Sequence, residues 1–191
     1  MALIELTDSE IVSRFQNVET KHEAFTLLLK KYQQRLYWHI RKMVINHEDA
    51  DDLIQDVFIK VWNHLEGFRE DAKLYTWLYR IATNECITFL NSKKNKQTVS
   101  LNESDEDAEN SNYLLNTLKS EQFLDGNNIQ IKLQEAILTL PDKQRLVFNM
   151  KYFDDLKYED LSEIMGTSVG ALKASYHLAV KKIEKFMLSH V

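Results

Sequence analysis

Hydrophobic side chains recur at steps of three and four residues along most of the chain, which is the spacing of one face of an α-helix. In the first half, this spacing predicts three helices with buried stripes. The stripes are Phe25, Leu28, Leu29, Tyr32, Leu36, Ile40 and Met43; Ala50, Leu53, Ile54, Val57, Phe58, Val61 and Leu65; and Tyr75, Leu78, Ala82, Cys86 and Phe89. Asn46 is the predicted N-cap of the second helix, and Gly67 is expected to end it.

The second half has a sharper pattern. A stripe from Leu133 to Leu140 stops at Pro141, and Asp142 is expected to start a new helix that buries Leu146, Val147 and Met150. A short helix over residues 158–165 follows, then Gly166 and Thr167, then a last helix from Ser168. Its buried stripe is Val169, Leu172, Tyr176, Val180, Ile183 and Met187. A short helix, a tight glycine turn and a longer helix form a helix-turn-helix pattern, although a generic helical hairpin has the same spacing.

The two halves are separated by a polar stretch at residues 97–112, QTVSLNESDEDAENSN, which has too few apolar side chains to offset the entropy of ordering. The predicted organisation is therefore an N-terminal segment (1–20), a helical domain (21–96), an acidic flexible linker (97–128) and a helix-turn-helix domain (129–191). The linker is either a plain spacer or a segment with a role of its own.

Composition supports an all-α fold. The 191 residues include only 4 Gly and 1 Pro, whereas sheet proteins need these residues at their turns. A single cysteine excludes an internal disulfide, and the 6 histidines have no metal-binding spacing, so neither a metal nor a cofactor is expected. No apolar run approaches the ~20 residues that span a membrane, and the N-terminus is acidic, so the expected location is cytoplasmic.

The net charge of −5 is unevenly distributed. Residues 1–20 carry −3 and residues 97–127 carry −6, whereas residues 21–96 carry +3 and residues 128–191 carry +1. The acidity that argues against a nucleic-acid binder therefore lies outside the two helical domains, which remain candidates for binding nucleic acid.

Three sets of residues face away from the predicted stripes. On the second predicted helix the outward line is Asp52, Gln55, Asp56, Ile59 and Asn63. On the third it is Thr76, Arg80, Thr83, Asn84, Ile87 and Asn91, beside Trp77. On the last helix it is Thr167, Gly170, Ala174, His177, Leu178, Lys181 and Lys185, flanked by Lys173. Solvated surface or core packing can explain any one of these sets. However, the aromatic side chain beside guanidinium and amide groups on the third helix suits the binding of unstacked bases. The small residues followed by lysines on the last helix suit a DNA groove.

Four motifs in order resemble the signatures of bacterial extracytoplasmic-function (ECF) sigma factors of the sigma-70 family. They are residues 49–58 (DADDLIQDVF), 76–84 (TWLYRIATN), 140–145 (LPDKQR) and 168–173 (SVGALK). The resemblance covers roughly residues 21–96 and 129–188. It implies a non-enzymatic transcription initiation factor that binds core RNA polymerase through its beta-prime and beta subunits, recognises promoter DNA and helps to melt it.

The resemblance also assigns residues. The polymerase-binding strip is Asp52, Gln55, Asp56 and Ile59, against the clamp helices of beta-prime. The residues expected at the promoter minus-ten element are Arg69, Lys73, Thr76, Trp77, Arg80 and Asn84, with the loop 66–73 resembling one that captures a flipped base. Those expected at the minus-thirty-five element are Thr167, Ser168, Lys173, Ala174, His177, Leu178 and Lys181. An anti-sigma factor is a further expected partner, and no small-molecule substrate is expected.

The last helix departs from the family pattern, because Ser175, Leu178 and Val180 stand where many relatives have arginine. Ala174 and Leu178 suit contact with thymine methyl groups, which predicts an A·T-rich element. Two other classes compete with the sigma factor. A helix-turn-helix regulator that binds duplex DNA alone leaves the first domain without a role, and a helical protein adaptor leaves the Trp77 surface and the helix-turn-helix without one.

Overall fold

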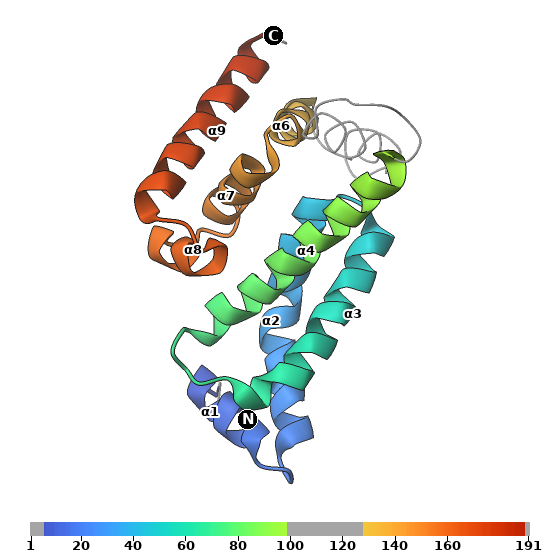
Figure 1. Ribbon diagram of the computed structural model, residues 1–191, viewed down its shortest axis with the longest axis vertical. Helices are drawn as coiled ribbons and strands as arrows, with labels where there is room; N and C mark the ends of the chain where they lie inside the picture. The colour runs from blue at the N-terminus through green and yellow to red at the C-terminus, as the bar shows by residue number, and fades with distance from the viewer. Residues whose placement is uncertain (1–5, 99–127, 190–191) are drawn as a thin grey trace.

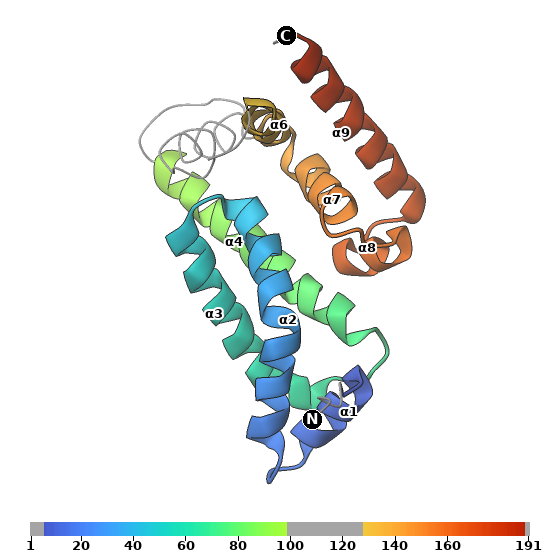
Figure 2. The same cartoon turned by 180° about the vertical axis from the view of Figure 1, so that it is seen from behind.

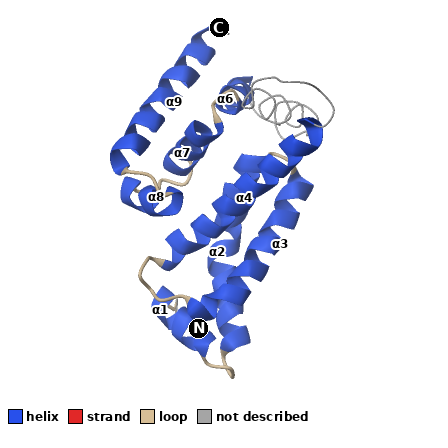
Figure 3. Cartoon of the chain, in the orientation of Figure 1, coloured by secondary structure: helices blue, strands red, loops and turns tan. Residues whose placement is uncertain are grey.

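The computed structural model describes residues 6–98 and 128–189, and every regular element in them is a helix (Figure 3). The first domain contains α1 (Asp8–Gln16), α2 (Lys21–Val44), α3 (His47–His64), the short 3-10 helix η1 (Leu65–Gly67) and α4 (Leu74–Thr98). The second contains α6 (Asn128–Leu138), α7 (Asp142–Tyr152), α8 (Tyr158–Met165) and α9 (Val169–Ser189). The all-α prediction is confirmed, and the expected acidic linker lies, apart from its ends, outside the described residues.

The first domain is a bundle of α2, α3 and α4, with α1 across one end (Figures 1 and 2). The predicted stripes form its core: Leu28, Leu36 and Ile40 of α2 are fully buried. Asn46 caps α3 as predicted, since its side-chain oxygen accepts a hydrogen bond from the Asp49 amide at 2.8 Å. Nine residues predicted as core are only half-buried, namely Phe25, Leu29, Tyr75 and Phe89 in this domain and Leu133, Val169, Tyr176, Val180 and Met187 in the second.

Helix α1 falls within the N-terminal segment, to which the hydrophobic pattern assigned no element. It begins with a capping box, in which the Glu10 amide donates to the Thr7 hydroxyl and the Glu10 carboxylate accepts from the Thr7 amide at 2.7 Å. Its buried residues are Ile11, Val12 and Phe15. The Tyr32 hydroxyl of α2 donates to the Asp8 carboxylate at 2.7 Å, which further fixes α1 on the bundle. The first domain therefore includes these residues.

The second domain contains the predicted helix-turn-helix. Helix α7 starts directly after Pro141, and α8 ends at Gly166, whose φ of 60° is left-handed and suits glycine. Helix α9 then packs against α6 and α7 through Ala179 and Ile183. The Tyr176 ring stacks on Phe148 of α7, with ring centroids 5.8 Å apart. The helix-turn-helix prediction is confirmed.

The two domains pack against each other. Helix α8 lies on α4 and α7 lies on α2 (Figure 1). Leu161 and Ile164 of α8 belong to the same buried hydrophobic cluster as Leu74 and Leu78 of α4. Helix α7 belongs to this shared cluster and also contributes Phe148 to the cluster inside the second domain. It is therefore buried on two sides. The sequence pattern gave no placement of one domain on the other.

Candidate functional site

Helix α3 carries an exposed strip on the face opposite its core contacts. The strip consists of Asp52, Gln55, Asp56 and Ile59, which lie at i, i+3, i+4 and i+7 and so share one side of the helix. All four are exposed, and Ile59 keeps 59% of its surface accessible. The four expected polymerase-binding residues therefore form one continuous surface.

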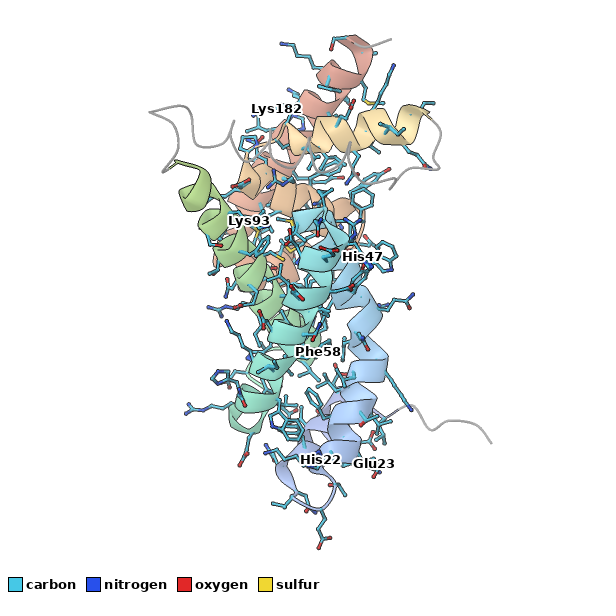
Figure 4. All side chains as sticks on the ribbon, turned by 90° about the vertical axis from the view of Figure 1, so that its right-hand side faces the viewer. His22, Glu23, His47, Phe58, Lys93 and Lys182 are labelled. Atoms are coloured by element: carbon cyan, nitrogen blue, oxygen red, sulfur yellow. The ribbon has the colours of Figure 1, made fainter. Side chains whose placement is uncertain are left out.

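An apolar groove of about 460 Å³ runs beside the strip, between α2 and α3. Its walls include Phe25, Leu29, Ile54, Gln55, Phe58, Ile59 and Trp62. Figure 4 faces the side on which these helices lie, and labels Phe58 midway along α3. The Trp62 ring meets Phe25 edge to face, with centroids 5.0 Å apart. Sequence reasoning read Phe25, Leu29 and Phe58 as core and did not single out Trp62, because a groove wall has the same hydrophobic spacing as a core.

A second surface is formed by the loop between η1 and α4 together with the first turns of α4. The Trp77 ring is half-buried and packs on Phe68, with centroids 5.2 Å apart and planes inclined by 46°. The Ser9 hydroxyl of α1 donates to the carboxylate of Glu70, a residue with a left-handed φ of 58°. Arg69 directly follows Phe68 in the sequence and is exposed. The loop is thus attached to α1, and Phe68, which is 9% exposed and belongs to the buried core cluster, supports the Trp77 ring.

The remaining residues predicted for the minus-ten surface differ in exposure. Arg80 and Asn84 are exposed as expected. Thr76 and the neighbouring outward candidate Thr83 are each only 2% exposed, so their expected outward orientation is wrong. The reason is that α4 packs on α2 and α3 on one side and on α8 on another, whereas the stripe analysis assumed burial on one face. Lys73 is exposed, but its ammonium pairs with Asp160 of α8 at 3.0 Å.

Helix α9 presents a third surface. Ala174, His177, Leu178 and Lys181 are exposed and share one face by the same i, i+3, i+4, i+7 spacing, with Ser168 and Lys173 exposed near its start. Thr167 is half-buried, and its hydroxyl donates to the Met165 carbonyl at 3.3 Å in the turn. Val180, one of the departures from arginine, is half-buried against the inner cluster of the second domain. Position 180 therefore contributes to packing.

The chemistry of the α9 surface suits a polyanion. From residue 169 to residue 183 the sequence contains three lysines and no acidic residue. Small side chains near the start of the helix permit close approach to a groove, and the lysines can meet phosphates. The described residues contain no group of three or more His, Cys, Asp and Glu side chains placed to bind a metal. Among these same residues, no helix is long and apolar enough to cross a membrane.

Comparison with known families identifies the class of protein. The family profile "Sigma-70 region 2" matches residues 28–96, and "Sigma-70, region 4" matches residues 130–183. Two solved structures have similar folds: a sigma factor RpoE in complex with the anti-sigma factor NepR from Bartonella quintana, and CnrH in complex with the cytosolic domain of CnrY. The first has a TM-score of 0.67 at 20% identity and covers 85% of this chain and 96% of its own. The second has a TM-score of 0.69 at 17% identity and covers 96% and 99%. The fold and both profiles define a sigma-70-type initiation factor.

Sequence relatives narrow the class to one group. The RNA polymerase sigma-H factor of Pseudomonas aeruginosa is 32% identical over 181 residues, covering 93% of this chain and 92% of the relative. The ECF RNA polymerase sigma-E factor of Haemophilus influenzae is 31% identical, covering 94% and 95%. SigW of Bacillus subtilis is 30% identical, covering 85% and 88%. The chain belongs to the ECF RNA polymerase sigma factors. It binds core RNA polymerase, directs the enzyme to specific promoters and helps to melt the DNA.

Proposed function

We propose that the three exposed surfaces divide this work. The α3 strip and its groove bind polymerase, the loop 66–73 and the exposed face of α4 hold the minus-ten element, and α9 reads the minus-thirty-five element. The observation that carries the proposal is the apolar groove bordered by exposed Ile59, because an accessible apolar surface rimmed by polar groups marks a protein interface. The first test is core binding by the strip variant described in the Discussion.

At the polymerase interface, the groove and the strip supply different contributions. A groove between two helices, lined by aromatic and branched side chains, can receive the apolar face of a partner helix. Asp52 and Asp56, on the same exposed face as the groove residues Gln55 and Ile59, favour basic side chains on the partner and set the orientation of docking. We infer that the partner surface is helical and basic, which agrees with the clamp helices that the family resemblance implies.

At the minus-ten element, the half-buried Trp77 ring, supported by the buried Phe68 ring, is the proposed stacking platform. Base–aromatic stacking contributes ~1–3 kcal/mol per base, which can offset the cost of unstacking a base from duplex DNA. Arg69, Arg80 and Asn84 are exposed and available for backbone and base contacts, and Lys73 is exposed as well, although it pairs with Asp160. Because Thr76 is buried, we leave it out of the proposed contact set.

At the minus-thirty-five element, side chains of α9 are expected to separate into readers of bases and binders of phosphate. Ala174 and His177 near the start of the exposed face would meet base edges, whereas Lys181 lies one turn further along and would meet phosphate. Substituting His177 or Ala174 should change which bases are preferred. Lys181→Ala should instead weaken binding to all DNA sequences alike and reduce the slope of log affinity against log salt concentration by about 1.

A promoter library selected with each variant, in complex with polymerase, distinguishes these roles. Lys182→Ala is a matched control, because this exposed lysine lies beside Lys181 but on a different side of the helix. Identical base preferences in the wild type and in the Ala174 and His177 variants would show that α9 does not read bases.

We further propose that the chain has no catalytic residues, that it acts in the cytoplasm with polymerase, and that an anti-sigma factor regulates it. One of the two solved structures of similar fold is a sigma factor in complex with an anti-sigma factor, and the other is CnrH in complex with the cytosolic domain of CnrY. A partner that covered the α3 groove would exclude polymerase directly. A regulator that binds duplex DNA alone would have no use for this groove.

A further inference from the structure

A cavity of about 520 Å³ lies where α2 and the start of α4 meet the segment that follows α7 (Figures 1 and 2). Its walls share no residue with the α3 groove or with the proposed promoter contacts. Small-molecule sites in proteins typically measure ~300–1,000 Å³ and are lined mainly by apolar and aromatic side chains with a few polar groups. The aromatic side chains that line this cavity are Tyr32, Trp38, Tyr75, Tyr79 and Phe153. The cavity therefore has the size and the walls of a ligand site.

Two of these aromatic rings are accessible from solvent. Trp38 on α2 is 47% exposed, and Phe153, directly after α7, is 40% exposed. The Tyr37 ring meets the Trp38 indole edge to face, with centroids 5.5 Å apart, and the Tyr37 hydroxyl lies 2.8 Å from His47 Nδ1. These contacts support the indole without covering it. The indole and the phenyl ring thus offer flat apolar faces to a planar ligand.

Both acidic side chains of the cavity already have basic partners. Asp154 accepts a hydrogen bond from His39 Nδ1 at 3.0 Å and forms an ion pair with Lys42. Burial raises the pKa of Asp154, but the contacts with His39 and Lys42 outweigh burial and hold the pKa below its ordinary value. Asp155 forms an ion pair with Lys151 at 3.3 Å. The walls therefore have no uncompensated carboxylate to attract a cation.

Arg35 is the remaining charged residue of the walls, and it is exposed on α2. In the part of the chain that the structure describes, no carboxylate forms an ion pair with its guanidinium. Burial raises the pKa of Tyr32 and of Tyr79, and the Arg35 charge acts in the opposite direction on both, so it lies within electrostatic range of both hydroxyls. The planar fork of a guanidinium binds a phosphate or a carboxylate through two hydrogen bonds. Arg35 is therefore placed to receive an anionic group.

We propose that this cavity binds a planar aromatic anion, such as a nucleoside monophosphate, with its ring against Trp38 and Phe153 and its anionic group on Arg35. The walls match both halves of such a ligand, since they combine accessible aromatic rings with one guanidinium that lacks a carboxylate. Aromatic cages also bind cations, but the charges of Arg35 and Lys42 oppose a cation here. The site is independent of the proposed function, because it uses none of the three surfaces that divide that work.

The test is isothermal titration calorimetry of the full chain without polymerase or DNA. The titrants are AMP, GMP and indole-3-acetate, which are planar aromatic anions with either a phosphate or a carboxylate. We expect at least one of them to bind at a ratio of one to one with a Kd below about 1 mM. Adenosine has no anionic group and inorganic phosphate has no ring, so each should bind at least about tenfold more weakly. The ranking of the three anions shows which anionic group the cavity prefers.

Two variants locate the ligand. Arg35→Gln should weaken binding of the anion at least about tenfold, because it removes the charge-assisted hydrogen bonds, and should leave the fold unchanged because the side chain is exposed. Arg14→Gln is the matched control, since Arg14 is an exposed arginine on α1 outside the cavity, and it should bind like the wild type. Trp38→Phe keeps an aromatic ring, but the change in tryptophan fluorescence on binding should disappear.

Several results would overturn the site. They are equal affinity in the wild type and in Arg35→Gln, a fluorescence change that persists unaltered in Trp38→Phe, and no binding of any of the three anions up to about 10 mM. Tighter binding of tetramethylammonium than of the anions would show a cation cage and would also overturn the proposal. Because no measurement includes polymerase, failure of the proposed function would leave these results unaffected.

Discussion

Reversing the charge of the α3 strip, with Asp52→Lys and Asp56→Lys together, is expected to weaken binding to core polymerase about 30-fold or more. Both side chains lie on the same face of α3 as Gln55 and Ile59, which line the apolar groove. A like-charge contact with a basic partner costs several kcal/mol, and a loss of ~2 kcal/mol corresponds to ~30-fold in Kd. The fold should be unaffected because both side chains are exposed. Fluorescence titration of labelled protein with core polymerase measures the change.

The same change in net charge elsewhere serves as the control for this prediction. Asp155→Lys with Glu159→Lys reverses two exposed carboxylates that are four residues apart in the sequence of the second domain. We expect this variant to bind core polymerase within about threefold of the wild type, because charges far from an interface are screened by salt. Unchanged affinity in the strip variant would show that the strip is not part of the polymerase interface. An equal loss of affinity in both variants would show that the effect comes from the overall net charge.

Trp77→Ala is expected to reduce promoter melting tenfold or more while closed complexes still form. The free-energy cost of melting must be offset by stacking of the unpaired bases on aromatic side chains. Removal of one aromatic platform loses ~1–3 kcal/mol of stacking free energy per base. Thymines at the minus-ten element should react with permanganate only when this protein and core polymerase are both present. Trp77→Ala should lower that reactivity far more than it lowers retention of promoter DNA in a gel-shift assay.

Trp77 also packs on Phe68, so a fold control is needed for this variant. Trp38→Ala removes an indole that is 47% exposed on α2, outside the proposed stacking surface, and should leave melting unchanged. Trp77→Phe keeps an aromatic face and should restore most of the reactivity. Melting that survives Trp77→Ala combined with Arg69→Ser and Lys73→Ser would exclude this surface as the minus-ten site.

The helices were predictable from sequence because their signals are local. Asn46 caps α3 as its position predicts, and Gly166 makes the turn before α9. The capping box at Thr7 and Glu10 carries an equally local signal for α1, although the hydrophobic pattern gave α1 no element. The exposed strip on α3 also follows from periodicity, because α3 uses only one face for the core.

The features that the sequence did not predict depend on contacts between distant segments. Thr76 is buried because α8 covers the start of α4, and a helical stripe does not show how many neighbours a helix has. Phe25 looked like core, yet it is only half-buried and lines an open groove, since a hydrophobic stripe has the same spacing whether its own chain or a partner covers it. No sequence pattern singled out Asp154, and only the fold brings its carboxylate to His39.

The central claim is that this chain supplies promoter specificity to core RNA polymerase. The most direct measurement is run-off transcription from a library of promoter fragments by purified core polymerase, with and without the protein, followed by sequencing of transcript starts. We expect transcripts from defined start sites only when both components are present, with shared upstream elements at those sites. Transcript starts that do not depend on the protein, or tight and specific duplex binding by the protein without polymerase, would contradict the claim.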